Sequence, residues 1–447
     1  MLPWTLREVA ALVSGRLRGG NGETRITGVS HNSRKVKRGD LFVAIVGSKW
    51  DGHRFLKEAG KRGARGAVVS KWVGGAKIPQ IQVEDTTRAL GDLGRAQRLQ
   101  WNGPVVAVTG SVGKTTVKDM AAHLLSGRYR VLKTGGNLNN QWGLPLTLLK
   151  LTGADEMAVV ELGINHPGEM EWLSGLARPD VAIVTAIGEA HLGFFKNRRH
   201  LAKEKLRIAD GLREGGVKIL NADDSFLRQE GKNVMTFGLK LGQVKAKDLR
   251  PQGFGTRFVL EAQGVRAATH LQMPGAHNVR NSLAAVSAGL ALGMPLRALA
   301  DRLKSFVPRA PMRMEIKNVK GVLFVNDAYN ASPTSMEAAL TTFQEMRGPK
   351  RKLAILGDML EMGDFSREAH RRVARLAAEA PFQGLVLVGN AMKKAYQELP
   401  EAHLEKVRCF PEISEVVSFL RRWVERGDAV LLKGSRGMRL EKILERL

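Results

Sequence analysis

The chain has 447 residues, of which 43% are hydrophobic and 25% charged, a balance that fits a folded globular protein and excludes wholesale disorder or a collagen-like structure. The single cysteine, Cys409, excludes an internal disulfide and a multi-cysteine zinc site. The net charge is +27, but the 70 Lys and Arg residues are spread along the chain and there are only three tyrosines, so we expect anionic substrates rather than nucleic-acid binding.

No segment has the length of a membrane span. The most apolar stretch, residues 283–296, covers about 14 residues, whereas a bilayer requires roughly 20. The first residues lack the basic and apolar regions of a signal peptide, and Thr5 and Glu8 instead have the spacing of a helix capping box. We therefore expect a cytoplasmic protein without stable membrane association.

The first of three predicted α/β domains covers residues 1–101. It contains the capped helix, short strands such as residues 40–46, and a glycine-rich stretch between Gly60 and Gly75. The sequence Gly103-Pro104 then interrupts a helical pattern directly before an apolar strand, which indicates a boundary.

The second domain, residues 102–308, alternates apolar strands with helical patterns, which is typical of βαβ units on a parallel sheet. Its predicted strands are residues 105–108, 157–160, 181–184 and 217–220. Residues 254–273 instead alternate apolar and polar side chains, which predicts an antiparallel addition to that sheet. A third, Rossmann-like series covers residues 309–447, with strands at 321–325, 353–356, 385–388 and 429–432.

The strand at 105–108 leads into the sequence Thr109-Gly-Ser-Val-Gly-Lys-Thr-Thr116 and then an amphipathic helix. This arrangement is typical of a phosphate-binding loop, because glycines let backbone N–H groups converge on phosphate oxygens at a helix N-terminus. Lys114 would reach the β- and γ-phosphates of ATP, and Thr115 would ligate Mg²⁺. Val108 stands where the general pattern has glycine, so the loop is a variant. The residues predicted to bind ATP here are Gly110, Ser111, Val112, Gly113, Lys114, Thr115 and Thr116. The fold class is thus α/β, with a P-loop ATPase-like parallel sheet in the central domain.

Two further positions are candidate metal ligands. Glu161 ends a predicted strand, at the sheet edge where α/β proteins bind ligands, and is either a Mg²⁺ ligand or a surface carboxylate. His191 follows the next predicted strand and is either a ligand or structural. The cations of the following helix, which include Lys203 and Lys205, are typical of a solvent-exposed face.

Two polar clusters flank the start of the third domain. His277, Asn278 and Asn281 have helical spacing that places them on adjoining parts of one face. Residues 326–330, Asn-Asp-Ala-Tyr-Asn, follow a strand, and Ser332-Pro333 then indicates the start of a helix. Helix capping does not explain the polar residues before it.

Taken together, these motifs resemble the Mur ligases, the ATP-dependent amide-forming enzymes of peptidoglycan precursor synthesis. The resemblance covers nearly the full length, through residues 109–116, 161–166, His191, Lys205, 275–278, 326–330 and 433–436. Residues 136–140, 161–168 and 356–363 are similar to the members that add D-alanyl-D-alanine to UDP-N-acetylmuramoyl-tripeptide. The Asp-Asn-Pro-Arg signature of the members that add the third amino acid is absent.

The resemblance implies an acyl-phosphate mechanism, in which the tripeptide carboxylate attacks ATP and the amine of D-Ala-D-Ala then displaces phosphate. Lys114, Lys205 and His191 would be catalytic. Two Mg²⁺ ions would be held by Thr115, Glu161, His191 and Lys205, and Lys205 matches the family lysine that is carbamoylated.

The same resemblance assigns substrate contacts to all three domains. Residues 1–101 would bind the UDP end of the substrate, 102–308 ATP, and 309–447 would complete the ligase site. Asn278 would lie near adenine, and Arg313 and Asp327 near the ribose and phosphates. Contacts to the UDP-substrate and the acceptor would come from Ser33, Arg34, Asp51, His53, Asn139, Asn330, Lys433 and Arg436. A monomer is expected.

The chain departs from the family pattern at Asn32, Arg207 and Met312. Met312 stands where glycine is common and bears on the hinge between the second and third domains, because losing glycine narrows the allowed backbone angles. Two alternatives stay open: an amide ligase of the same superfamily with another substrate, and a P-loop ATPase whose positive charge binds nucleic acid.

Overall fold

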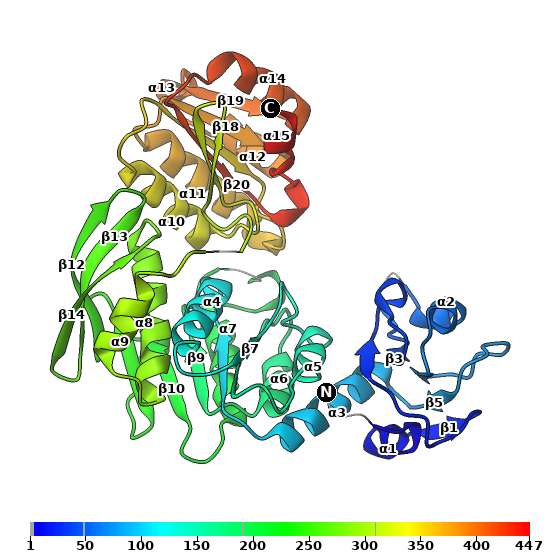
Figure 1. Cartoon of the computed structure of the whole chain (residues 1–447). Helices are drawn as coiled ribbons and strands as arrows, with labels where there is room; N and C mark the ends of the chain where they lie inside the picture. Colours follow the sequence, from blue (N-terminus) through cyan, green and yellow to red (C-terminus); the bar gives the residue numbers. More distant parts are fainter. Residues whose placement is uncertain (1–3, 48–49, 190–191, 309) are drawn as a thin grey trace.

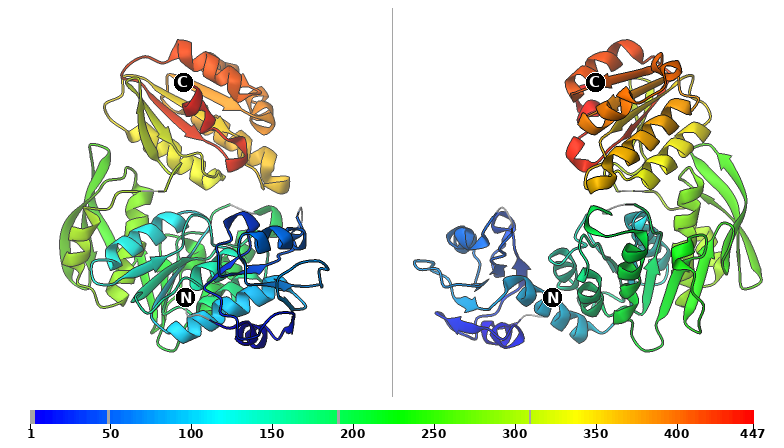
Figure 2. Two further views of the ribbon diagram at one scale, coloured as in Figure 1. Left: turned by 45° about the vertical axis from the view of Figure 1, so that its right-hand side comes forward. Right: turned by 180° about the vertical axis from the view of Figure 1, so that it is seen from behind.

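The computed structural model describes residues 4–47, 50–189, 192–308 and 310–447. Three β-sheets follow one another along the chain, each combined with helices (Figure 1). The view from behind in Figure 2 shows the N-terminal sheet set apart at one side of the central sheet, with the C-terminal sheet above it. The predicted α/β class is confirmed.

The N-terminal sheet has the strand order β1-β5-β4-β3-β2, parallel except for β1. Its strands are β1 (Arg16–Arg18), β2 (Gly28–Ser30), β3 (Asp40–Val43), β4 (Gly66–Val69) and β5 (Gln80–Gln82). Around it lie α1 (Leu6–Leu12), α2 (Leu56–Lys61) and the 3₁₀ helices η1 (Ser33–Lys35) and η2 (Gly52–Phe55). Thr5 and Glu8 form the predicted capping box at α1.

Helix α3 (Thr86–Trp101) links this sheet to the next one. It ends at Trp101 because Asn102 takes the left-handed conformation, with φ +51°. The buried Arg98 donates from Nε to the carbonyl of Ala177, at the end of α6 (Glu169–Ala177), over 2.8 Å. This contact fixes the linking helix against the central domain.

The central sheet has nine strands in the order β14-β13-β12-β11-β10-β9-β6-β8-β7. They are β6 (Val105–Thr109), β7 (Val131–Lys133), β8 (Met157–Glu161), β9 (Val181–Val184), β10 (Val217–Asn221), β11 (Val234–Gly238), β12 (Val244–Gln252), β13 (Gly255–Ala262) and β14 (Val265–Leu271). Strands β6 to β12 pair in parallel with one another, whereas β13 pairs antiparallel with β12 and β14 antiparallel with β13, as the alternation in 254–273 predicts.

Helices cover both faces of this sheet, so β6 is buried along its whole length. Val106 and Val108 join the core beneath one helical layer, and Val105 and Ala107 join the core on the other face. The first layer includes α4 (Lys114–Leu125), α8 (Ala276–Ala291) and α9 (Leu296–Leu303), and the second α5 (Gly143–Leu148), α6 and α7 (Arg198–Leu206). Short 3₁₀ helices are η3 (Leu192–Phe194), η4 (Arg207–Gly211) and η5 (Ser225–Leu227).

The C-terminal sheet has the order β15-β16-β20-β17-β18-β19, parallel except for β15. Its strands are β15 (Glu315–Val319), β16 (Val322–Asn326), β17 (Lys352–Gly357), β18 (Gly384–Val388), β19 (Val407–Phe410) and β20 (Ala429–Lys433). The helices are α10 (Pro333–Glu345), α11 (Ser366–Glu379), α12 (Asn390–Gln397), α13 (Glu401–Leu404), α14 (Ile413–Trp423) and α15 (Lys442–Arg446), with η6 (Gly363–Phe365) and η7 (Arg436–Met438). In the described parts of the chain, no helix is long and apolar enough to cross a bilayer.

Candidate active site

The phosphate-binding loop connects β6 to α4, as predicted. Gly110 and Gly113 both have positive φ, of 147° and 84°. A Cβ atom on Gly110 would lie 1.9 Å from Oγ1 of Thr185, and one on Gly113 would lie 2.5 Å from Oδ1 of Asn281. Both positions therefore require glycine, for backbone angle and for space.

Polar groups of the loop lie where phosphate oxygens bind in such loops. Lys114 begins α4, and its Nζ donates to the carbonyl oxygens of Gly110 and Ser111 over 2.8 and 3.4 Å. Burial lowers the pKa of Lys114, the nearby Glu161 opposes this shift, and Arg313 adds to it. The buried hydroxyl of Ser111 has no hydrogen-bond partner within the described residues. A phosphate group would supply such a partner.

Thr115 and Glu161 form the candidate metal-binding pair. The Thr115 hydroxyl donates to Oε2 of Glu161 over 2.8 Å, and both side chains are buried. Asn139 donates from Nδ2 to Oε1 of the same carboxylate over 2.8 Å. Glu161 is thus no surface loop residue. The contact of Asn139 with Glu161 joins distant segments and was not foreseen from the sequence.

Lys205 lies on the buried face of α7 with an exposed fraction of 1%, whereas Lys203 is exposed. The interpretation of this helix as an exposed cationic face is therefore wrong for Lys205. Burial, and then the charge of Lys114, lower its pKa well below the usual lysine value, while Glu204 opposes the shift. No hydrogen bond or ion pair joins the Nζ atom of Lys205 to another described residue.

The neighbouring Glu204 fixes the orientation of α7. Its Oε1 accepts hydrogen bonds from the backbone N–H groups of Gly168 and Met170, at 2.8 and 3.1 Å, at the N-terminus of α6. A carboxylate is favourable at that position because of the helix dipole. His191, the other predicted ligand on this side, lies outside the described residues.

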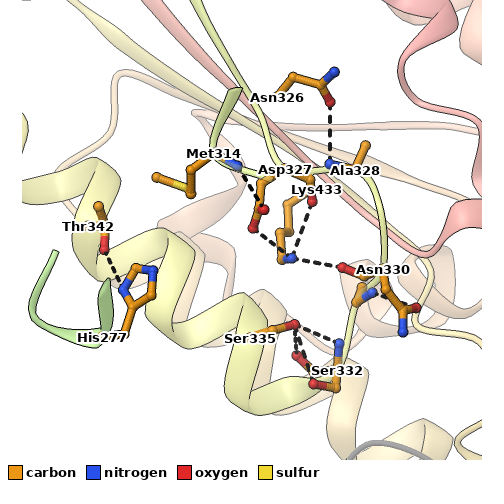
Figure 3. A network of polar contacts seen from close by, with 11 residues as sticks. His277, Met314, Asn326, Asp327, Ala328, Asn330, Ser332, Ser335, Thr342 and Lys433 are labelled. Atoms are coloured by element: carbon orange, nitrogen blue, oxygen red, sulfur yellow. Dashed lines mark hydrogen bonds and ion pairs between the residues drawn. The ribbon is translucent and has the colours of Figure 1, made fainter. Parts of the chain in front are cut away.

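A second polar network surrounds the end of β16 (Figure 3). Lys433, at the end of β20, forms an ion pair of 2.7 Å with Asp327 and donates to the carbonyl oxygens of Asp327 and Asn330. The other carboxylate oxygen of Asp327 accepts from the backbone N–H of Met314. Oδ1 of Asn330 accepts a hydrogen bond from the backbone N–H of Ala331.

Helix α8 brings His277 and Asn278 to the same region. His277 lies 3.2 Å from the Thr342 hydroxyl of α10, which joins the central and C-terminal domains (Figure 3). Burial lowers the His277 pKa to about 4; Asp327 opposes that shift, and Arg280 and Lys433 add to it. Asn278 is buried and donates to the Pro274 carbonyl. The predicted spacing brings Asn281 within 3.4 Å of Asn278.

Residues 312–314 join the two domains in a strained backbone conformation. Met312 and Met314 have φ of +57° and +52°, a region that non-glycine residues rarely adopt. The guanidinium of Arg313 lies 4.0 Å from the centre of the Tyr329 ring. Arg436 donates to the sulfur of Met312 and pairs with Glu441.

In the N-terminal domain, Asp51 and His53 contact each other through Oδ1 and Nδ1 over 2.6 Å. Nε2 of His53 accepts from the backbone N–H of Ser70, so Nδ1 carries the proton that Asp51 accepts. Burial alone would raise the Asp51 pKa, but hydrogen bonds from His53 and Lys71 outweigh it and lower the pKa to about 2. This pair holds the loops after β3 and β4 together.

Ser33 and Arg34 lie in η1, after the neighbouring strand β2. The hydroxyl of Ser33 donates to Glu58 over 3.0 Å, while Arg34 is exposed. Asn32, where the family pattern is acidic, accepts from the Arg34 N–H and caps η1. Because β2, β3 and β4 are parallel neighbours, all these residues meet at one edge of the sheet.

Comparisons with known proteins agree with the motifs. Three family profiles match: "Mur ligase family, catalytic domain" over residues 25–98, "Mur ligase middle domain" over 108–289, and "Mur ligase, glutamate ligase domain" over 312–436. The chain is 35% identical to the UDP-N-acetylmuramoyl-tripeptide–D-alanyl-D-alanine ligase of Bacillus subtilis and 33% identical to that of Escherichia coli. Each match covers 100% of this chain and 99% of the relative.

Solved structures show the same likeness. A crystal structure of MurF from Acinetobacter baumannii has a TM-score of 0.91 and 33% identity, over 99% of this chain and 98% of that one. MurF ligase from Thermotoga maritima in complex with ADP has a TM-score of 0.82 and 31% identity, over 94% and 96%. The relatives described above carry the name MurF or UDP-N-acetylmuramoyl-tripeptide–D-alanyl-D-alanine ligase. The chain therefore belongs to the Mur ligase family.

Proposed function

We propose that this chain joins D-alanyl-D-alanine to UDP-N-acetylmuramoyl-tripeptide, with ATP converted to ADP and phosphate. The observation that carries the proposal is the reaction centre formed by Lys114, Glu161 and Lys205 at the phosphate-binding loop. The full-length likeness to ligases of that name supports the choice of substrates. The enzyme works as a cytoplasmic monomer and requires no nucleic acid.

In the first step, a carboxylate oxygen of the tripeptide attacks the γ-phosphorus of ATP. An O–P bond forms, the bond to the β-phosphate oxygen breaks, and ADP leaves. Lys114 and the N–H groups at the start of α4 hold the phosphate oxygens and offset their charge. The hydroxyl of Ser111 donates to the same group.

In the second step, the amine nitrogen of D-Ala-D-Ala attacks the carbonyl carbon of the acyl phosphate. A C–N bond forms, the C–O bond to phosphate breaks, and the amine loses a proton to solvent. Enclosure between the central and C-terminal domains keeps water from the acyl phosphate. The ion pair of Asp327 and Lys433 stabilises the C-terminal wall of this space.

The residues present fit a magnesium site. Thr115 and Glu161 offer buried oxygen donors at the end of the phosphate loop, the type of ligand that Mg²⁺ shares with nucleotide phosphates. The described residues hold no group of three or more His, Cys, Asp or Glu side chains that could bind a metal, so phosphates and water would complete the coordination. Bound magnesium would neutralise phosphate charge. His191 and Lys205 would hold a second ion.

Lys205 fits carbamoylation for a physical reason. Burial and the charge of Lys114 lower its pKa, which favours the neutral Nζ amine, and a neutral amine can add to CO₂ with release of one proton. The resulting carbamate is an anion, which places a charge opposite to that of Lys114 beside it. An anion there can ligate a metal ion.

The remaining predicted contacts are part of this proposal. Asn278 binds adenine, and Arg313 and Asp327 bind the ribose and phosphates. The UDP end of the substrate binds at the sheet edge that carries Ser33, Arg34, Asp51 and His53. Asn139 positions Glu161, and Asn330, Lys433 and Arg436 line the acceptor side.

The proposal is tested by phosphate release from Mg²⁺-ATP with each substrate alone and with both together. We expect release to require both, with a product mass equal to that of the pentapeptide. Release that does not respond to the pair would refute the substrates, and stimulation by DNA or RNA instead, lost at high salt, would favour a nucleic-acid-dependent ATPase.

A further inference from the structure

A cavity of about 490 Å³ lies between the central and C-terminal domains. Its central-domain wall follows β9 and includes the first turn of α7, and its C-terminal wall is the start of α11 with the segment before it. Its lining includes Glu189, Lys196, Arg199, Met362, Phe365 and Arg372. Its volume is within the range of small-molecule sites.

The cavity lies next to the reaction centre. A Cβ atom on Gly188, the residue before Glu189, would lie 3.4 Å from Cβ of Ser111 in the phosphate loop. Helix α7 starts in the cavity wall at Arg198 and carries Lys205 farther along. From Arg199 to Lys205 the helix rises about 9 Å, which is fewer than two helical turns. The cavity wall and the reaction centre are therefore connected by the segment before Glu189 and by α7.

Two cations of the cavity wall are free to bind an anion. Arg198 is engaged, because it donates to the Ile187 carbonyl and its guanidinium lies 4.9 Å from the centre of the Phe226 ring. Arg372 pairs with Glu189 and Glu337. Lys196 and Arg199 are exposed and have no ion pair or side-chain hydrogen bond with any described residue. They lie at the N-terminal end of α7, which itself favours negative charge.

The opposite wall offers apolar contacts. Met362 and Ala369 are largely buried, and Phe365 is 46% exposed. These side chains face a space that a ligand with small apolar groups would fill. An exposed phenylalanine beside two free cations suits a ligand that combines methyl groups with a carboxylate.

We propose that this cavity binds the acceptor dipeptide, with its carboxylate on Lys196 and Arg199 and its methyl groups on Met362 and Phe365. The inference rests on the proposed function and identifies the residues that select the second substrate. Because the two walls belong to different domains, the dipeptide also holds the domains together while it reacts.

The C-terminal wall is braced by the segment that the resemblance assigns to the acceptor side. The N–H of Leu360 donates to the Ser435 hydroxyl over 2.8 Å, and the N–H of Met359 donates to Nε2 of His370 over 2.8 Å. These contacts fix the segment that ends in Met362. Ser435 thus supports the wall of the cavity without lining it.

The test compares D-Ala-D-Ala with D-alanyl-D-alaninamide, which lacks the carboxylate, in steady-state kinetics of the full chain. The variants are Arg199→Ala, Lys196→Ala and the double variant, with Lys203→Ala as a control because Lys203 is an exposed cation of the same helix that does not line the cavity. In the double variant we expect KM for the dipeptide to rise about tenfold or more, and the preference for dipeptide over amide to fall by a similar factor. KM for ATP and for the UDP-substrate stays unchanged.

A second variant tests the apolar wall: Phe365→Ala raises KM for the dipeptide and the amide equally. Two results overturn this inference in a chain that still has ligase activity. One is a double variant that prefers the dipeptide over the amide as strongly as the wild type does, and the other is a Lys203→Ala variant that loses this preference to the same extent as the double variant. If the double variant turns over too slowly, Arg199→Lys, which keeps the charge, has to retain more of the preference than Arg199→Ala. A wild-type chain that forms no pentapeptide instead refutes the proposed function.

Discussion

The hydroxyl of Thr115 donates a 2.8 Å hydrogen bond to the buried carboxylate of Glu161. Thr115 belongs to the first turn of α4, and Glu161 ends β8, the strand beside β6. The phosphate loop and the neighbouring strand therefore place two oxygen ligands at one point.

We expect Thr115→Val, which keeps the shape and removes the oxygen, to lower kcat/KM for ATP by about 100-fold, because one preorganised polar group of the reaction centre is lost. Thr115→Ser serves as the control and retains activity. Steady-state kinetics over a range of Mg²⁺ concentrations checks this. Equal activity of the valine and serine variants would contradict a role for the hydroxyl.

Lys205→Ala removes the buried amine and with it the proposed carbamate. We expect kcat to fall by about 100-fold or more, whereas Lys203→Ala, on the exposed side of α7, leaves it unchanged. Removal of bicarbonate and CO₂ from the buffer should lower wild-type activity reversibly. Full activity of the alanine variant, together with the absence of bound CO₂ in mass measurements of the native chain, would refute carbamoylation.

Met312 has a left-handed backbone conformation, which asparagine tolerates and a β-branched residue does not. We expect Met312→Asn to exceed Met312→Val in free energy of unfolding by about 1 to 2 kcal/mol. At Lys317, an exposed residue of strand β15, we expect the valine variant to have the higher free energy of unfolding and the asparagine variant the lower one, because strands favour valine. Urea titration provides both comparisons. The same order at both positions would show that strain at Met312 is not the cause.

The buried environment of His277 predicts a pH effect on stability. Its folded pKa of about 4 lies below the value near 6.5 of an unfolded chain, so the unfolded state binds the proton more readily between these values. The neutral, buried His277 side chain therefore costs the folded state no free energy of protonation above pH 6.5, and the folded state loses stability relative to the unfolded state as the pH falls from 6.5 towards 4. Between pH 7 and pH 5, the free energy of unfolding should therefore fall more for the wild type than for His277→Gln. Equal losses would contradict the assignment.

The parts of the site that are local in sequence could be predicted. The strand, the loop with Gly110 and Gly113, and the helix that starts at Lys114 are adjacent along the chain, and their residue types determine their structure. The end of β8 at Glu161 and the antiparallel addition after residue 254 follow from strand patterns in the same way.

Features that depend on packing between distant segments could not be predicted. The burial of Lys205 depends on which face of α7 meets the central domain, and the pattern of charges on that helix indicates the opposite. The contact of Asn139 with Glu161 requires the sheet order, which places β7, the strand before Asn139, beside β8. The conformation of Met312 is imposed by the junction of two domains, and from the sequence only the resemblance, in which glycine is common at this position, points to an unusual backbone there.

The most direct test of the mechanism is to follow an oxygen atom. The tripeptide is prepared with ¹⁸O in its terminal carboxylate and is incubated with Mg²⁺-ATP, D-Ala-D-Ala and the enzyme. An acyl-phosphate intermediate transfers one labelled oxygen to the released phosphate for each pentapeptide formed, and mass spectrometry of the phosphate detects it. Pentapeptide formed with unlabelled phosphate would show that the carboxylate never attacks the γ-phosphorus, and would contradict the account.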